Sequence, residues 1–345
     1  MFLLPRRRFL QSLAAGSLAA ARVARAGQPA MAGTVETVLG PAAIETLGPT
    51  LMHEHLLVDF IGADRVSRDR YDRDEVVTRM LPFLEGARAE GCRTIVECTP
   101  AFIGRDPLLL KRLSEASGIA LLTNTGYYGA ANDKFVPAHA YDETAEQLAA
   151  RWIREAKEGI EGTGIKPAFM KIGVDAGRLS PIDEKLVRAA ALTHKATGLV
   201  IGSHTGDGVA AIAQLDVLRA VGVPASSFIW IHAQNEKDRA VHAAAAERGA
   251  WVEFDGLSEK SFDEHVQLVL HLRERGHLAR TLVSHDAGWY HVGEPNGGEM
   301  RPFTLLFKRF LPALRKAGLT AAEKRQLIVD NPHRALATTR RPAEG

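Results

Sequence analysis

The stretch that decides the fold is residues 168–204, which contains AFMKIG (168–173), DEKLVRAAALTHKATG (183–198) and LVIGSH (199–204). The first and last runs are short and rich in aliphatic residues, as buried strands are, whereas the middle run has helical spacing and ends in glycine. A strand, a helix and a second strand in this order form a parallel pair. The stretch therefore predicts one strand–helix–strand unit.

The same unit repeats along the chain from residue 50 onward. Helix-like stretches at 75–91, 145–160, 183–198, 209–222 and 237–249 separate eight predicted strands. The strands are TLMHEH (50–55), RTIVECT (93–99), IALLTNTG (119–126), AFMKIG (168–173), LVIGSH (199–204), FIWIHA (228–233), AWVEFDG (250–256) and TLVSHD (281–286). Eight such units predict an α/β fold, a (β/α)8 TIM barrel. An open doubly wound sheet is the alternative, but no G-x-G-x-x-G follows the first strand.

The rest of the chain is expected to complete one domain over residues 33–337. The polar interval 60–73 is predicted to be an active-site loop, and the glycine-rich interval 287–301 a loop after the last strand. Closing helices are expected at 302–318 and 320–337, and a flexible tail at 338–345. The two cysteines, Cys92 and Cys98, fall in one predicted strand, too far apart for a disulfide, and are expected to be buried thiols.

Composition excludes some function classes. The 345 residues are 46% hydrophobic and 24% charged, which is ordinary for a globular protein, and the net charge is only +2. That balance gives no electrostatic bias toward nucleic acid or acidic lipid. We therefore expect a small-molecule partner, with no nucleic acid and no membrane once a signal is removed, and a homodimer is left open.

The N-terminus has the pattern of an export signal. PRRRFLQ (5–11) is followed by the apolar stretch SLAAGSLAAARV (12–23) and by Ala24-Arg25-Ala26. A basic start, a short apolar middle and an A-x-A end are typical of a cleavable signal, and the paired arginines resemble the twin-arginine type. We expect residues 1–26 to be this signal and the mature protein to be periplasmic. The alternative is a retained N-terminal helix that tethers the chain to a membrane.

Metal-ligand side chains stand at the ends of five predicted strands. In a strand, residues i and i+2 face the same side, so the two histidines of H-x-H in the first strand can bind one ion. The C-terminal ends of the strands form the catalytic face of a TIM barrel. Six candidate residues gather there: His53, His55, Lys171, His204, His232 and Asp286. A lone histidine near a strand is usually a packing residue, but this set predicts a metal centre.

Lys171 is the unusual member of the set. It lies between Met170 and Ile172, where a buried cation is costly. It could extend to solvent or pair with an acid. A neutral lysine amine can instead react with carbon dioxide to give a carbamate, whose two oxygens can bridge two divalent cations.

In these residues the chain resembles the phosphotriesterase family of the amidohydrolase superfamily, from about Gly48 to the closing NPHRAL (331–336). The resemblance implies a binuclear centre, with His53, His55 and Asp286 on the more buried ion. His204 and His232 would bind the more exposed ion, and carboxylated Lys171 and a hydroxide would bridge the two. We expect zinc, with manganese, cobalt and iron as alternatives. The hydroxide would attack the ester, and Asp286 would accept its proton.

Substrate selectivity is expected in the loops that follow the strands. Tyr127 or Tyr128 after the third strand, and Trp289 and Tyr290 after the eighth, are candidate substrate-binding residues. Asp255 is a candidate pocket or proton-relay residue. His285 neighbours Asp286 but should face away from the site and serve as a packing or supporting residue.

The sequence predicts hydrolysis of a lactone or a simple carboxylic ester. The segment after the sixth strand, HAQNE (232–236), departs from the acid-rich relay segment that phosphotriesterases tend to have there, and FDGLSEKS (254–261) lacks the histidine that would complete the relay. A phosphotriesterase or another phosphoester hydrolase is the alternative. A third alternative is a periplasmic binding protein on a degenerate barrel. Such a protein would need neither Lys171 nor Asp286, and both are present.

Overall fold

The computed structural model describes residues 33–337. Within them, parallel strands form two hydrogen-bonded sheets. The larger sheet contains, in spatial order, β11 (Thr281–Val283), β10 (Trp251–Phe254), β9 (Phe228–Ile231), β8 (Ile201–Thr205), β7 (Phe169–Val174) and β6 (Asn124–Thr125). The smaller sheet contains β12 (Gly288–His291), β3 (Thr50–Val58), β4 (Thr94–Glu97) and β5 (Ala120–Leu122).

The two sheets join at both edges into one barrel. Only Thr123 separates β5 from β6, and its carbonyl accepts a hydrogen bond from the Ala168 amide at 2.8 Å. At the other edge, the Asp286 amide donates to the His53 carbonyl at 3.0 Å, between β11 and β12. The eight predicted strands are therefore all present in sequence order, and the TIM barrel is confirmed.

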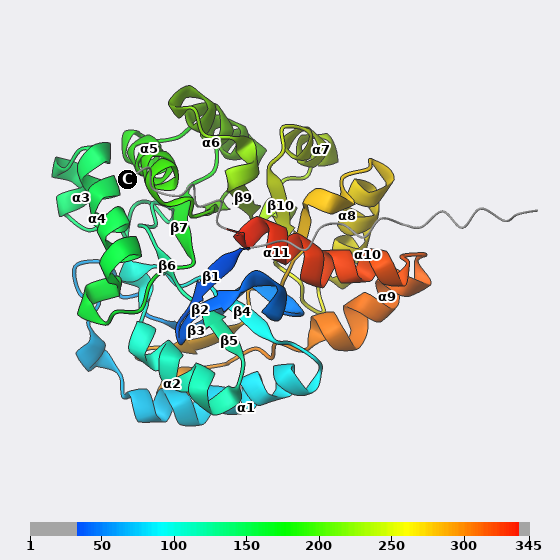
Figure 1. Ribbon diagram of the computed structural model, residues 1–345, viewed down its shortest axis with the longest axis horizontal. Coiled ribbons are helices and arrows are strands. Elements are labelled where there is room, and N and C mark those ends of the chain that lie inside the picture. The colour runs from blue at the N-terminus through cyan, green and yellow to red at the C-terminus, as the bar shows by residue number, and fades with distance from the viewer. Residues whose placement is uncertain (1–32, 338–345) are drawn as a thin grey trace, which may run out of the picture. The chain divides into compact units, whose positions relative to one another are not determined.

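Helices cover the outside of the barrel, as Figure 1 shows. They are α1 (Arg73–Ala89), α2 (Pro107–Ser117), α4 (Ala145–Glu158), α5 (Pro181–Thr197), α6 (Gly208–Val221), α7 (Arg239–Glu247) and α8 (Phe262–Glu274). The α5 helix shows why these bounds follow from sequence. Ser180 and Asp183 form a capping box, Pro181 occupies the first turn, and Gly198 ends the helix at φ 76°. Among the described residues, no helix is both long and apolar enough to cross a bilayer.

The C-terminal part is more irregular than expected. The predicted helix 302–318 contains a π-helical turn, η9 (Leu306–Phe310), before α9 (Leu311–Lys316). The predicted helix 320–337 contains α10 (Ala321–Arg325), the π-helical η10 (Gln326–Asp330) and α11 (Asn331–Leu336). A proline at the second position of α9 and of α11 has no amide to donate, which favours a local change in the hydrogen-bond pattern.

Two further segments differ from the sequence prediction. Residues 34–43, for which no element was predicted, form an antiparallel hairpin of β1 (Thr34–Thr37) and β2 (Gly40–Ala43). The hairpin and α11 pack apolar side chains against the first residues of the barrel strands. Figure 1 shows the hairpin over the middle of the barrel, with α11 beside it. The predicted loop 287–301 begins with β12, which pairs with β3.

The loop at 60–73 and the two cysteines match the sequence prediction, and the expectations for the termini are untested. The interval 60–73 is a loop that contains only the short 3-10 turn η2 (Arg68–Arg70) before α1 begins. Cys92 and Cys98 are free and buried, as predicted. The expected signal at 1–26 and tail at 338–345 lie outside the described residues.

Candidate metal centre

All six predicted metal-site side chains line one cavity. His53 and His55 lie on β3, Lys171 on β7 and His204 on β8, while His232 follows β9 and Asp286 follows β11. These strands run parallel in the closed barrel, so their C-terminal ends meet at one mouth. The sequence prediction that these side chains converge is therefore met by the geometry.

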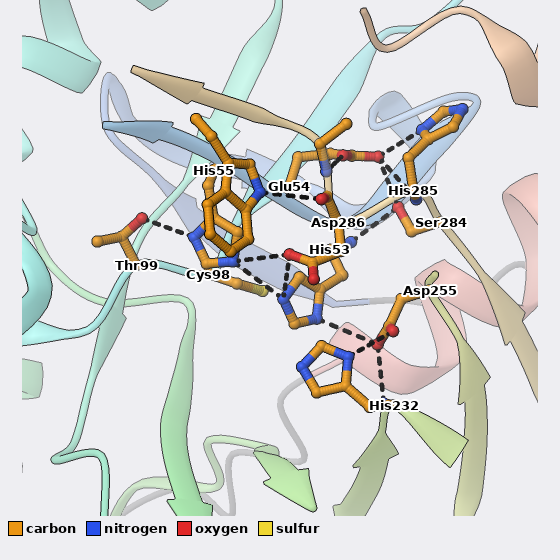
Figure 2. Close-up of polar contacts among 12 residues, drawn as sticks. His53, Glu54, His55, Cys98, Thr99, His232, Asp255, Ser284, His285 and Asp286 are labelled. Atoms are coloured by element: carbon orange, nitrogen blue, oxygen red, sulfur yellow. Dashed lines mark hydrogen bonds and ion pairs between the residues drawn. The ribbon is translucent and has the colours of Figure 1, made fainter. Parts of the chain in front are cut away.

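One group of side chains that could hold an ion contains His53, His55 and Asp286, shown in Figure 2. The Nε2 atoms of the two histidines lie 3.2 Å apart. Asp286 Oδ1 lies 3.1 Å from Nε2 of His55 and 3.6 Å from Nε2 of His53. Burial raises the pKa of the Asp286 carboxyl, but the neighbouring histidines outweigh this effect and hold the pKa below its ordinary range. Asp286 is thus a carboxylate at neutral pH.

The polar contacts of the two Nδ1 atoms indicate where the lone pairs of these histidines point. Thr99 Oγ1 donates to the Glu97 carboxylate at 2.5 Å, so it accepts from His55 Nδ1 at 2.8 Å. His53 Nδ1 faces Asp255 Oδ2 at 3.3 Å. Both rings therefore carry their proton on Nδ1 and direct an Nε2 lone pair toward each other and toward Asp286. Such a meeting of lone pairs and a carboxylate fits a bound divalent cation.

Asp255 links this group to His232 and is the residue whose role the sequence did not reveal. It is fully buried. Its Oδ1 accepts from His232 Nδ1 at 2.6 Å and from Gln234 Nε2 at 2.8 Å. Its Oδ2 accepts from the His232 amide at 2.9 Å and faces His53. Asp255 therefore orients two metal-site histidines; it does not line the cavity, so its predicted role as a pocket residue is corrected.

His204 and Lys171 complete the other side of the centre. The rings of His204 and His232 lie 4.4 Å apart, and burial lowers the pKa of His204 well below its ordinary value. Lys171 is 1% exposed, and burial lowers the pKa of its amine. A lower pKa increases the neutral fraction, which is the form that reacts with carbon dioxide. The structure therefore fits the proposed carbamate at Lys171.

Strained backbone occurs at two of the ligand positions. His232 has φ 63° and Asp286 has φ 54°, both in the left-handed region that residues with a Cβ rarely adopt. Such a strained backbone conformation persists only where the surrounding structure holds it in place. Left-handed conformations of this kind cluster at sites where a side chain must be aimed. Here they turn the two side chains toward the cavity at the strand ends.

Buried acidic side chains contact β3 on the side that faces away from the cavity. Glu54, between the two histidines, points away from the cavity and accepts hydrogen bonds from Ser284, from the Ala287 amide and from His285 Nδ1 at 2.7 Å. His285 thus faces away from the metal centre, as the alternation predicted. On the neighbouring strand, burial raises the pKa of Glu97 to about 7. These contacts fix β3, and Glu97 could have been noticed as an acid inside an apolar run.

The structure divides the predicted substrate residues into two sets. Tyr128 and Trp289 line the cavity. The Tyr128 ring lies 5.0 Å from the His204 ring, and the Trp289 ring lies 5.3 Å from the His55 ring. Tyr127 lies outside the cavity, where its hydroxyl contacts His139 Nε2 at 3.0 Å, and the Tyr290 hydroxyl donates to Glu75 at 2.9 Å. The expectation that Tyr127 and Tyr290 contact substrate is therefore not supported by their positions.

The cavity itself is small and has apolar walls. Its volume is about 90 Å³. Besides the metal-site side chains, its lining includes Val58, Phe60, Ile103, Tyr128 and Trp289. Burial raises the pKa of the Tyr128 hydroxyl, so this group is neutral and can donate a hydrogen bond.

Together, the barrel and the buried histidines and carboxylates define a metal-dependent hydrolase. The comparisons then give the family. The chain belongs to the Phosphotriesterase family, whose model matches residues 33–336.

Named relatives and solved structures agree with this assignment. The "Phosphotriesterase homology protein" of Escherichia coli (strain K12) is 31% identical over 294 residues, covering 84% of this chain and 98% of that protein. An "Aryldialkylphosphatase" of Saccharolobus solfataricus is 26% identical over 308 residues, covering 86% and 97%. A structure of a mutant "PTE-like lactonase" from Deinococcus radiodurans superposes with TM-score 0.79 at 27% identity, covering 88% and 100%.

Proposed function

We propose that the protein hydrolyses lactones with a binuclear metal centre held by His53, His55, Lys171, His204, His232 and Asp286. Zinc is the proposed metal, with manganese, cobalt and iron as alternatives, and Lys171 is proposed to be carboxylated. When bound, two such ions would lower the pKa of a water molecule and polarise the carbonyl oxygen of the ester. The other proposed contributions to catalysis come from the side chains of the protein.

The position and charge of Asp286 support a role as acceptor of the proton that leaves the attacking water. Its pKa lies below the ordinary range, and its Oδ1 faces the space between the histidines. The Trp289 indole donates to the Asp286 carbonyl at 2.9 Å, which steadies the residue despite its strained backbone. We propose that Asp286 takes up this proton and then releases it toward the leaving oxygen.

The observation that carries the lactone proposal is the small apolar cavity with one neutral hydroxyl, that of Tyr128. A compact ring fits such a space, whereas an aryl phosphotriester must place three bulky substituents around phosphorus. Asp255 is fully engaged with His53, His232 and Gln234, so it offers no free oxygen for a proton relay. A Cβ on Gly256 would meet Gln234 Nε2 at 2.7 Å, so a side chain at this position would require Gln234 to shift away from Asp255.

The phosphotriesterase alternative is favoured by the relatives with that activity in their names. Metal-loaded protein should be assayed on a panel of lactones and on aryl phosphotriesters. We expect kcat/KM for the best lactone to exceed that for the best phosphotriester by at least about tenfold, or about 1.4 kcal/mol. Tyr128→Phe should lower lactone hydrolysis more than phosphotriester hydrolysis, and Tyr127→Phe, outside the cavity, is the matched control. Faster phosphotriester hydrolysis would replace the lactone proposal with the alternative.

The cellular location is proposed from the sequence. We propose that the twin-arginine-type signal at residues 1–26 directs the folded chain to the periplasm. That route carries folded proteins, which suits a metal centre assembled before export.

A further inference from the structure

A second and larger cavity lies at the opposite end of the barrel. Its volume is about 500 Å³, within the range of small-molecule sites. It is lined by residues that precede or begin successive strands: Val200 before β8, Ser227 before β9, Trp251 at the start of β10 and Arg280 before β11. The cavity at the metal centre shares none of these residues. The two sites are therefore at the two ends of the strands.

Two arginines, Arg280 and Arg334, face this cavity without acidic partners. Within residues 33–337, no ion pair or hydrogen bond engages the Arg280 guanidinium, which lies 4.8 Å from the centre of the Trp251 ring. Arg334 donates to the Asp330 carbonyl at 3.2 Å and to the side chain of Asn331, which are neutral groups. Burial lowers the pKa of Arg280, and the positive charge of Arg334 lowers it further. Two like charges thus line one cavity, and both guanidinium groups have donors that no described acidic side chain engages.

The other walls position polar groups beside the arginines. His194 Nδ1 donates to the Leu199 carbonyl at 2.8 Å, so its Nε2 accepts from Ser227 Oγ at 2.9 Å. The Trp251 indole donates to the Ser226 carbonyl at 3.2 Å, which fixes the ring under Arg280. The Ser227–His194 pair and Trp251 are therefore held in place, and no described acidic side chain lines the cavity.

We propose that this cavity is a second binding site, which takes a small organic oxyanion that carries a phosphate or a carboxylate group. Guanidinium groups match such oxygens in pairs of parallel hydrogen bonds. A bound oxyanion would relieve the repulsion between Arg280 and Arg334, and the volume leaves space for an organic part against Trp251. The site is independent of the proposed hydrolysis. Because Arg280 ends the turn that leads into β11, an occupied site should also stabilise the folded chain.

Calorimetric titration of the metal-loaded full chain with inorganic phosphate and with glutarate, at matched ionic strength, tests the proposal. The wild type should bind at least one of the two probes with a dissociation constant below about 1 mM. Phosphate alone would indicate a phosphorylated ligand, and glutarate alone a carboxylate ligand. Arg280→Gln should weaken binding by at least about tenfold, and Arg280→Lys, which keeps the charge but loses the planar fork, by less.

Two controls separate this site from others. Arg275→Gln removes the same charge from an exposed arginine that does not line the cavity, and it should bind like the wild type. Phosphate can also reach the metal centre, so inhibition of hydrolysis by phosphate is measured in parallel and should be equal in all variants. Equal affinity in the wild type, Arg280→Gln and Arg280→Lys would overturn the proposal, as would failure of both probes to bind the wild type.

Discussion

Replacing Asp255 with asparagine should damage the metal centre without touching a metal ligand. The two Asp255 oxygens accept three hydrogen bonds, from His232 Nδ1 and Gln234 on Oδ1 and from the His232 amide on Oδ2, and Oδ2 also faces His53 Nδ1 at 3.3 Å. Asparagine has one oxygen and one amino group. In one orientation its amino group faces His232 Nδ1 and Gln234, and two hydrogen bonds are lost. In the other it faces the His232 amide and His53 Nδ1, and one hydrogen bond and the His53 contact are lost. If the amino group faces a histidine Nδ1, that ring is driven to the tautomer whose proton occupies Nε2.

The expected size of the effect follows from burial and from the contacts. Asp255 is fully buried, and each donor left without an acceptor costs about 1–3 kcal/mol. Loss of a carboxylate that orients a ligand histidine typically weakens metal binding by about 10–100-fold. We therefore expect Asp255→Asn to bind at least one ion about 10–100-fold more weakly and to unfold at lower denaturant concentration in its metal-free form.

Competition with a chromophoric chelator measures the metal affinity, and urea unfolding of the metal-free protein measures stability. Asp263→Asn is the matched control, because Asp263 is exposed in the first turn of α8. It should behave like the wild type in both assays. If Asp255→Asn retains both ions with wild-type affinity, the argument that Asp255 sets the tautomers of His53 and His232 is refuted.

Three further predictions concern other parts of the molecule. Lys171→Ala should lose most activity and weaken at least one metal site, and added short carboxylates should restore part of the activity; full metal content with an unchanged rate would contradict the carbamate. Burial lowers the pKa of His53 from 6.5 to about 4, so the unfolded chain binds a proton that the folded chain excludes. The free energy of unfolding of the metal-free protein should therefore fall, by up to about 3 kcal/mol, as pH drops from about 6.5 to 4, and a flat profile in urea titrations would argue against this. A reporter fused to residues 1–30 should reach the periplasm, and Arg6→Lys with Arg7→Lys should block export; unchanged export would indicate another route.

The barrel was predictable because its repeats are local. Each strand is a short apolar run and each helix has its own caps, as at Ser180 and Gly198, so neighbouring residues carry the information. The hairpin at residues 34–43 was not predictable in this way, because its short strands gain their burial only from the strand starts that they cover. The β12 strand was not predicted, because the glycines that follow it indicated a loop. Its hydrogen-bonding partner is the backbone of β3, which lies far away in the sequence.

The metal-ligand positions were predictable because each stands at a strand end, where topology alone brings side chains together. The roles of Asp255 and Glu97 were not, because they depend on contacts between strands. Asp255 follows β10, far from His53 in sequence, and contacts it across the barrel mouth, and Glu97 is linked to His55 through Thr99. Tyr127 and Tyr128 are adjacent in sequence, yet only Tyr128 enters the cavity, because successive side chains diverge.

The most direct test of the central claim is the metal content of the purified chain after supplementation with zinc, manganese or cobalt. Elemental analysis should give about two divalent ions per chain in the wild type, as expected for a two-metal site. The same measurement on His53→Ala and on His204→Ala should show a loss in each, since the two histidines lie on opposite sides of the centre. A well-folded wild type that holds one ion or none would contradict the account.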